Sequence, residues 1–121
     1  MSIDTEEKLG TLKISDEVIA LCTMNATLKT EGISALSGGI GGSFSKNILG
    51  KDPLYKGIKV SQAEDGIIID IHVIVTYGFK IPQVAWDVQE NVKKEVELMT
   101  DADVKAVNIH VQGVHFLEEE D

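Results

Sequence analysis

The stretch "GIIIDIHVIVTY", residues 66–77, decides the fold because its side chains alternate regularly in character. Its odd-numbered positions up to 75 are all aliphatic: Ile67, Ile69, Ile71, Val73 and Val75. Its even-numbered positions include Asp70, His72 and Thr76. A period of two over this length predicts a long β-strand with one buried face and one partly polar face.

The segment before this strand is predicted to be its hairpin partner. "GIKVSQ" at 57–62 has the composition of a strand, and "AEDG" at 63–66 separates it from the long strand. Asp65-Gly66 suits a tight β-hairpin turn, because both residue types tolerate left-handed backbone. We therefore expect the two strands to pair antiparallel.

Two amphipathic helices are predicted on either side of this hairpin. The first begins at Ser15, which caps it ahead of Asp16 and Glu17, and it ends before Gly32. Its expected buried stripe is Val18, Leu21, Cys22, Asn25, Ala26 and Lys29. The second helix, "IPQVAWDVQENVKKEVELM" at 81–99, has Pro82 in its first turn. Its expected buried stripe is Val84, Ala85, Val88, Val92, Val96 and Met99.

The last predicted element is a strand, "VKAVNIHVQGV" at 104–114, with Val107, Ile109 and Val111 facing inward. The order αββαβ places the chain in the α+β class, with a three-stranded mixed sheet and both helices packed on one face. We expect a single domain over 1–121 with disordered tails at 1–9 and 116–121. Residues 30–56 are expected to form a long connector that contains glycines and lysines.

Composition limits the function. Twenty acids against eleven lysines leave a net charge of −9, and there is no arginine. An acidic chain without arginine is a poor candidate for general nucleic-acid binding. The sequence has no run of about 18 apolar residues, and its first ten residues lack the apolar core of a secretory signal. The single Cys22 excludes an intramolecular disulfide and is expected to be buried and inert. These features predict a cytoplasmic protein.

The glycine-rich segment "SGGIGGS", residues 37–43, has several functional interpretations. It lacks the Gly-Lys-Ser/Thr ending of a P-loop, and it follows a helix where a dinucleotide fingerprint follows a strand. It contains the G-x-x-G spacing of a KH clamp, so a KH-like nucleic-acid-binding module is the alternative function. A flexible connector is the favoured interpretation. The residues concerned are Gly38, Gly39, Gly41 and Gly42, followed by the anion-binding candidates Lys46, Lys51, Lys56 and Lys59.

The face of the sheet opposite the helices is the first candidate interface. If the last strand lies beside the long one, Asp70, His72 and His110 come close together, a set suited to a metal or an acid–base pair. No nucleophile or further ligand accompanies them, so we expect no catalytic residue, no metal and no other cofactor. A mixed polar and apolar face is instead typical of a surface that meets a partner. Its candidates are Ile68, Asp70, His72, Ile74, Asn108, His110 and Gln112.

The second candidate interface lies on the long helix and contains Trp86 and Lys93. At 100° per residue, Trp86 points away from the valine stripe, and Lys93 is one of its outward neighbours. An exposed tryptophan is either a surface ring that lies on lysine stems or a contact for a partner. The sequence leaves both interpretations open.

Five segments occur in order: "KISDEVIA" at 13–20, "LSGGIGG" at 36–42, "YKGIKV" at 55–60, "YGFKIPQVAWDVQENVK" at 77–93 and "VNIHVQGV" at 107–114. Taken together, they resemble the alkaline-shock / general-stress protein family of Gram-positive bacteria, also called the envelope stress response family. Trp86 departs from the polar or basic residue expected at that position of the family. The chain also lacks the longer polar extensions of some members, so it resembles the short, housekeeping type.

This resemblance implies a small cytoplasmic protein linked to stress and envelope homeostasis, with no established enzymatic activity and no catalytic residues to carry over. In some members it implies a location near the membrane, held there by an anchored partner. We therefore expect a non-enzymatic protein that self-associates or docks to a membrane-anchored envelope protein. We expect no transmembrane segment and no nucleic-acid partner.

Overall fold

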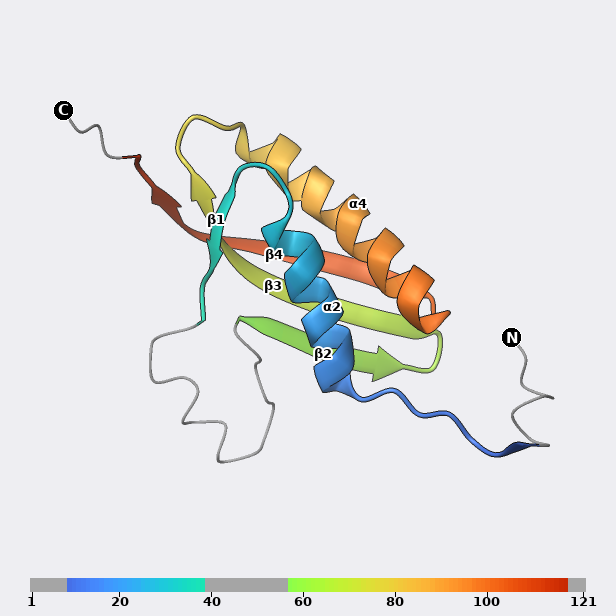
Figure 1. The fold of residues 1–121 in the computed structure, drawn as a ribbon. Coiled ribbons are helices and arrows are strands. Elements are labelled where there is room, and N and C mark those ends of the chain that lie inside the picture. Colours follow the sequence, from blue (N-terminus) through green and yellow to red (C-terminus); the bar gives the residue numbers. More distant parts are fainter. Residues whose placement is uncertain (1–8, 39–56, 118–121) are drawn as a thin grey trace.

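The computed structural model describes residues 9–38 and 57–117, which contain two helices and four strands (Figure 1). Their order is α2 (Asp16–Leu28), β1 (Ile33–Leu36), β2 (Ile58–Ala63), β3 (Gly66–Thr76), α4 (Ile81–Thr100) and β4 (Val104–His115). The α+β class is confirmed. The expected tails at 1–9 and 116–121 lie almost entirely outside the described residues, and so does most of the expected connector.

The sheet is mixed, as predicted, and β3 is its central strand. β1 and β2 both pair antiparallel with β3, while β4 pairs parallel with it. The count of three strands was wrong, because β1 occupies part of the expected connector at 30–56. β1 has only four residues, so its sequence carries almost no period. Its strand conformation comes from pairing with β3, in which Leu36 lies opposite Val73.

β1 and β2 lie one after the other along the same edge of β3. β1 covers positions 73–75 and β2 covers positions 66–71. His72 lies between them: its carbonyl accepts the Ser37 N–H at 2.8 Å, and its own N–H donates to the Gly57 carbonyl at 2.9 Å. Ser37 and Gly57 therefore both bond this edge at a single residue of β3.

Both helices pack on one face of the sheet (Figure 1), and the core lies between them and β3. The buried positions of β3 and the valine stripe of α4 are confirmed. Met99 was wrongly expected in that stripe; it is 64% exposed, close to where α4 ends. Core residues of β3 and α4 are Ile67, Ile69, Ile71, Val73, Val75, Val84, Val88, Val92 and Val96.

The buried stripe of α2 differs from the one expected. Its N-cap is confirmed, since the Ser15 hydroxyl accepts the Val18 N–H. Val18 and Leu21 are however exposed, at 44% and 42%. Threonines occupy the buried face because each hydroxyl donates to the carbonyl four residues earlier, which leaves no polar atom without a partner. The buried residues are Ile19, Ala20, Thr23, Ala26 and Thr27, and the hydrogen bonds of Thr23, Thr27 and Thr30 span 2.7–2.9 Å.

Cys22 is half-buried against the core rather than fully buried. Its pKa is raised, first by burial and then by the nearby charge of Glu95. A raised pKa keeps the sulfur in the less nucleophilic thiol form. In the described ranges, neither helix is long and apolar enough to cross a bilayer.

Candidate functional site

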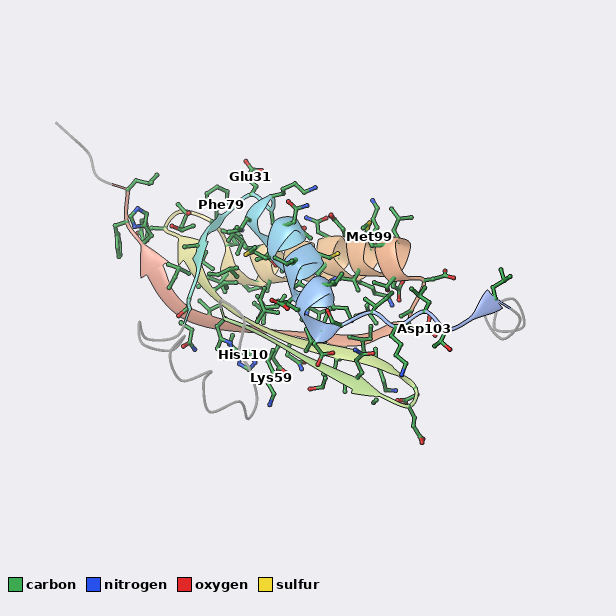
Figure 2. All side chains as sticks on the ribbon, turned by 60° about the horizontal axis from the view of Figure 1, so that its bottom comes forward. Glu31, Lys59, Phe79, Met99, Asp103 and His110 are labelled. Carbon is green, nitrogen blue, oxygen red and sulfur yellow. The ribbon has the colours of Figure 1, made fainter. Side chains whose placement is uncertain are left out.

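The open face of the sheet, opposite the helices, brings several predicted candidates together. The parallel register sets Asp70 beside Asn108 and His72 beside His110. All four side chains have the even-numbered parity that points away from the core. Figure 2 shows His110 and Lys59 on the side of the sheet away from the helices. We call these four residues, Asp70, His72, Asn108 and His110, the polar cluster.

The polar cluster is joined by short contacts. One carboxylate oxygen of Asp70, Oδ1, accepts from Asn108 Nδ2 at 3.1 Å and lies 3.1 Å from His110 Nε2. The rings of His72 and His110 stack with centroids 4.5 Å apart and planes 12° apart. His72 Nδ1 lies 3.2 Å from the Gly57 carbonyl oxygen. The cluster thus extends from Asn108 to the Gly57 carbonyl at the edge of the sheet.

The pKa of Asp70 is lowered from its ordinary value of 3.8. Burial is the largest single influence and raises it, but the other influences together outweigh burial. These are the hydrogen bonds from His110 and Asn108, and then the charges of His110 and Lys59. Lys59 lies directly opposite Asp70 on β2. Asp70 is therefore held as a carboxylate at neutral pH.

Replacing Asp70 with asparagine is expected to remove a pH-dependent part of the stability. A lowered pKa in the folded state stabilises the fold above the unfolded value near 3.8, and this contribution disappears as the pH falls through the folded value. Urea unfolding midpoints measured from pH 2 to 6 should show Asp70→Asn less stable than the wild type above about pH 4. The two curves should converge at lower pH. A constant difference across the whole range would contradict this assignment.

Two isoleucines and Gln112 complete the open face. Ile68 and Ile74 are half-buried, and Gln112 is exposed. Ile74 lies over Gly113, where an added Cβ would come within 3.2 Å of Ile74 Cδ1. No helix in the described part of the chain covers this face (Figure 2). Among the described residues, this face therefore has apolar side chains on either side of the polar cluster and no helix over it.

The metal interpretation of the polar cluster gains no support from the described residues. Within 9–38 and 57–117, no group of three or more His, Cys, Asp or Glu residues is arranged to hold a metal ion. Asp70 is instead engaged with Asn108 and His110.

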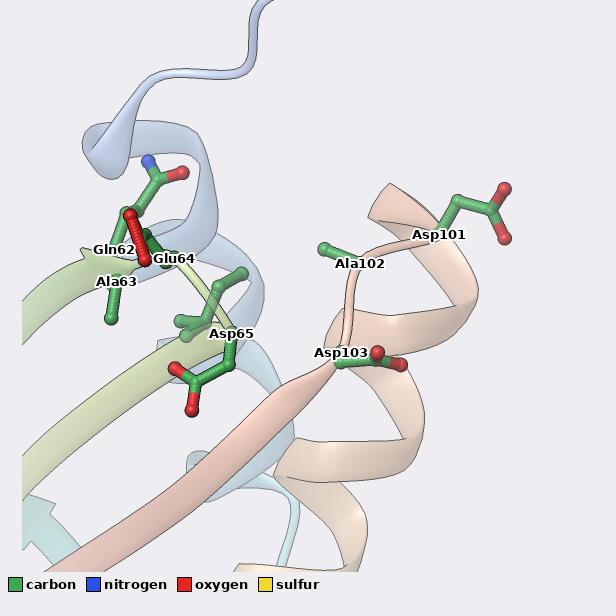
Figure 3. Close-up of a pocket in the computed structure, with 9 residues that line it drawn as sticks. Gln62, Ala63, Glu64, Asp65, Asp101, Ala102 and Asp103 are labelled. Carbon is green, nitrogen blue, oxygen red and sulfur yellow. The ribbon is translucent and has the colours of Figure 1, made fainter. Parts of the chain in front are cut away.

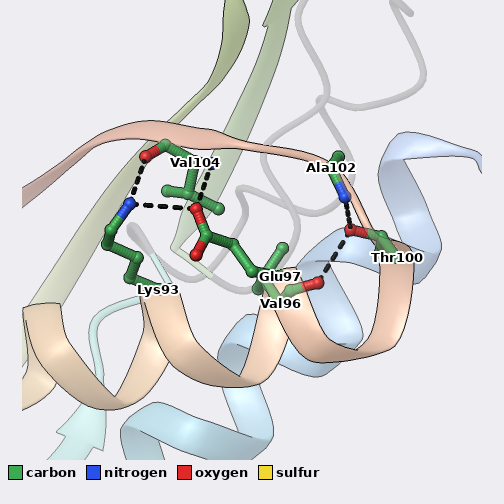
Figure 4. Close-up of polar contacts among 6 residues, drawn as sticks. All are labelled: Lys93, Val96, Glu97, Thr100, Ala102 and Val104. Carbon is green, nitrogen blue, oxygen red and sulfur yellow. Dashed lines mark hydrogen bonds and ion pairs between the residues drawn. The ribbon is translucent and has the colours of Figure 1, made fainter. Parts of the chain in front are cut away.

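The interface candidates on α4, Trp86 and Lys93, lie on the other side of the sheet, and only Lys93 is engaged in hydrogen bonds to β4. Trp86 is 53% exposed, as predicted. Lys93 donates from Nζ to Glu97 Oε2 at 2.9 Å and to the Val104 carbonyl at 3.0 Å. The same Glu97 oxygen accepts the Val104 N–H at 2.9 Å (Figure 4). Lys93 and Glu97 thus fasten α4 to the start of β4.

This contact also sets the protonation of Glu97. Its pKa is lowered, first by the hydrogen bond from the Val104 backbone and then by the hydrogen bond from Lys93. Thr100 closes the turn that follows, because its hydroxyl donates to the Val96 carbonyl and accepts the Ala102 N–H (Figure 4).

Of the glycine-loop candidates, only Gly38 lies within the described residues, where it is exposed. Of the lysine candidates, only Lys59 is described, and it lies on the open face beside Asp70. The remaining candidates lie outside the described residues: Gly39, Gly41, Gly42, Lys46, Lys51 and Lys56.

A shallow pocket that the sequence did not indicate lies at the far end of the sheet (Figure 3). Its volume is about 540 Å³, and the β2–β3 hairpin and the turn after α4 line it. The carboxylates of this pocket come from two segments that are distant in sequence and lie together only in the folded sheet. No local sequence pattern therefore predicts the pocket. One of them, Asp65, forms an ion pair with Lys105 at 2.9 Å. The lining carboxylates are Glu64, Asp65, Asp101 and Asp103.

Comparison with known proteins identifies the family. The family model of alkaline shock protein 23, described as having a cell envelope-related function, matches residues 4–116. The chain belongs to this family. The resemblance to the alkaline-shock and general-stress proteins is therefore confirmed.

Individual relatives agree with this assignment. The uncharacterized protein YqhY of Bacillus subtilis is 35% identical over 120 residues, which cover 96% of this chain and 86% of YqhY. A stress response regulator gls24 homolog of Streptococcus pyogenes is 24% identical over 91% of this chain and 62% of its own length. A solved MamM-CTD structure matches 82% of this chain and 98% of its own, with 11% identity and a TM-score of 0.49. This structural similarity is too weak to indicate a function.

Proposed function

We propose that this member of the family is a non-enzymatic interaction protein of the cell envelope stress response. It acts by self-association or by docking to a membrane-anchored envelope protein, and its open sheet face is the docking surface. The single observation that carries the proposal is the composition of this face. Ile68 and Ile74 lie on either side of the polar cluster, on a face that no helix within residues 9–38 and 57–117 covers.

The open face is more apolar than is usual for a sheet face that contacts only water. A sheet with one solvated face normally alternates buried apolar residues with polar ones. Here the outward positions of β3 include two isoleucines beside a carboxylate whose hydrogen bonds are already made within the face. Apolar area next to a small number of fixed polar groups is the usual composition of a protein-binding surface.

A pull-down from the membrane fraction of the native cell, in mild detergent, tests the proposal. With the wild-type protein as bait, we expect to recover a membrane-anchored protein. That protein should also bind the purified wild-type protein directly. Ile74→Lys, which places a charge in the apolar part of the open face, should reduce recovery at least tenfold. Leu98→Lys is the matched control, because Leu98 is 80% exposed on α4, away from this face. It should leave recovery unchanged.

Two results would count against the proposal. Equal recovery with Ile74→Lys and the wild type would show that the open face is not the docking surface. Salt-sensitive recovery of RNA, lost when Lys51 and Lys56 are changed to glutamate, would favour the nucleic-acid alternative. That alternative has no support from the comparisons.

A further inference from the structure

Within residues 9–38 and 57–117, the second half of β4 has no strand on its outer edge. In the described part of the chain, β4 pairs with β3 alone. Side chains of α4 bind the outer edge of β4 only near its start. Lys93 and Glu97 bond the Val104 backbone, and Gln89 Nε2 donates to the Val107 carbonyl at 3.0 Å. Beyond Val107, none of the described helix side chains hydrogen-bonds to this edge.

The direction of the backbone groups on this edge follows from the register. The Val107 carbonyl points away from β3, because it accepts from α4. Backbone direction repeats every two residues along a strand, so Ile109 and Val111 also point their N–H and C=O groups outward. The hydrogen bonds of β3 agree with this direction. The His72 backbone bonds to Ser37 and Gly57 on the other edge of β3, so the backbone groups of Ile71 and Val73 point towards β4. In this parallel register, their partners Ile109 and Val111 point their own backbone groups away from β3. Ile109 and Val111 therefore offer four outward backbone groups.

Between Val107 and Val111, this edge lacks the charges, proline and β-bulges that usually prevent edge-to-edge pairing; the register shift of β4 lies just beyond, between Val111 and Gly113. Natural edge strands use lysine, proline or inward charges for this purpose. The segment "VNIHVQGV" at 107–114 has no Lys, Asp, Glu or Pro, in a chain of which 26% is charged and whose net charge is −9. His110 is its sole titratable residue. A second copy of the chain thus meets no fixed opposing charge along this segment.

We propose that two copies of this chain pair antiparallel through the free edges of their β4 strands and form one continuous sheet. Ile109 of each copy lies opposite Val111 of the other, which satisfies all four outward groups on both edges. His110 then lies opposite its own counterpart on the two-fold axis. The proposal rests on the self-association named in the proposed function and adds the β4 edge as a second contact surface, separate from the open face. It joins the open faces of the two copies into one.

Trp86 is placed to support this contact. It precedes Gln89 by about one helical turn and Lys93 by about two, so it shares the face of α4 that reaches over the β4 edge. Gln89 and Lys93 act at the start of β4, and Trp86 lies further along, towards its uncovered half. A half-exposed tryptophan next to a free strand is well suited to pack on the strand or helix that a second copy adds.

Disulfide trapping tests the register directly. In a Cys22→Ala background, His110→Cys places the two sulfurs at a non-hydrogen-bonded antiparallel pair, with Cα atoms about 4.5 Å apart. Mild oxidation should convert most of this variant into a covalent dimer. Asn108→Cys is the matched control, two residues away on the same face. Its two copies would lie about 13 Å apart, too far for a disulfide, so its yield should be at least tenfold lower.

Sedimentation provides the second measurement. The wild type should have about twice the chain mass of 13.1 kDa. Val111→Pro removes one outward N–H and leaves the bonds to β3 in place, so it should sediment as a folded monomer. A monomeric wild type, or equal cross-linking at 108 and 110, would overturn the proposal. A monomeric wild type would leave the recovery of a membrane-anchored partner in the pull-down unchanged. Failure of the β4 dimer can therefore be distinguished from failure of the proposed docking function.

Discussion

Replacing Gly57 with alanine is expected to destabilise the fold by roughly 2–4 kcal/mol, because two separate penalties coincide there. Gly57 has a φ of +84°, which strains any residue with a Cβ. An added Cβ would also lie 2.5 Å from the Ser37 carbonyl oxygen, a backbone atom of a residue whose N–H is bonded to β3. Equilibrium urea unfolding measures the loss.

Two other glycines separate the backbone strain from the steric contact with Ser37. Gly78 has a φ of +108° and nothing within 4 Å of an added Cβ, so Gly78→Ala carries the strain alone. Gly38 has open space around it and no positive φ, so Gly38→Ala should be close to neutral. We expect the order Gly57, Gly78, Gly38 from most to least destabilising. Equal effects at Gly57 and Gly78 would show that the contact with Ser37 is unimportant.

Ile71→Ala is expected to cost about 2–5 kcal/mol, the usual range when a buried aliphatic side chain is truncated. Ile71 is fully buried on the central strand, beneath the helices. The cost combines the lost burial with a cavity that β3 cannot close, because it is held by strands on both sides. The free energy of unfolding at neutral pH is the measurement.

Ile74→Ala is the control for Ile71→Ala, because it removes the same atoms from the same strand on the opposite, open face. Ile74 is half-buried, so its truncation should cost less than half as much. If the two variants were equally destabilised, the open face would be as closely packed as the core, and a docking role for it would lose its physical basis.

Most of the fold could be predicted from local patterns. The period of two in β3, the Asp65-Gly66 turn and the valine stripe of α4 each indicated their element correctly. β1 was missed because four residues carry no usable period, and its conformation depends on pairing with a distant strand. The stripe of α2 was misplaced because Thr23 and Thr27 look polar in sequence, while their hydroxyls are satisfied within the helix.

The candidate site was predictable only in part. Alternation placed Asp70 and His72 on the outward face, and the same rule placed Asn108 and His110 there. Their contacts depend on a parallel register between β3 and β4, which no short-range pattern specifies. The structural role of Lys93 was also out of reach, because its partner carbonyl at Val104 belongs to a strand whose position depends on the whole topology.

The interrupted edge of the sheet has a consequence for how this chain accommodates changes in length. Leu36 faces Val73, Ser37 faces His72 and Ile58 faces Ile71, so residues 37 and 58 occupy successive positions of one strand. If Ser37 were joined directly to Ile58, the alternation of inward and outward side chains would continue unbroken. We therefore expect a variant that joins Ser37 directly to Ile58 to keep the register of this edge on β3.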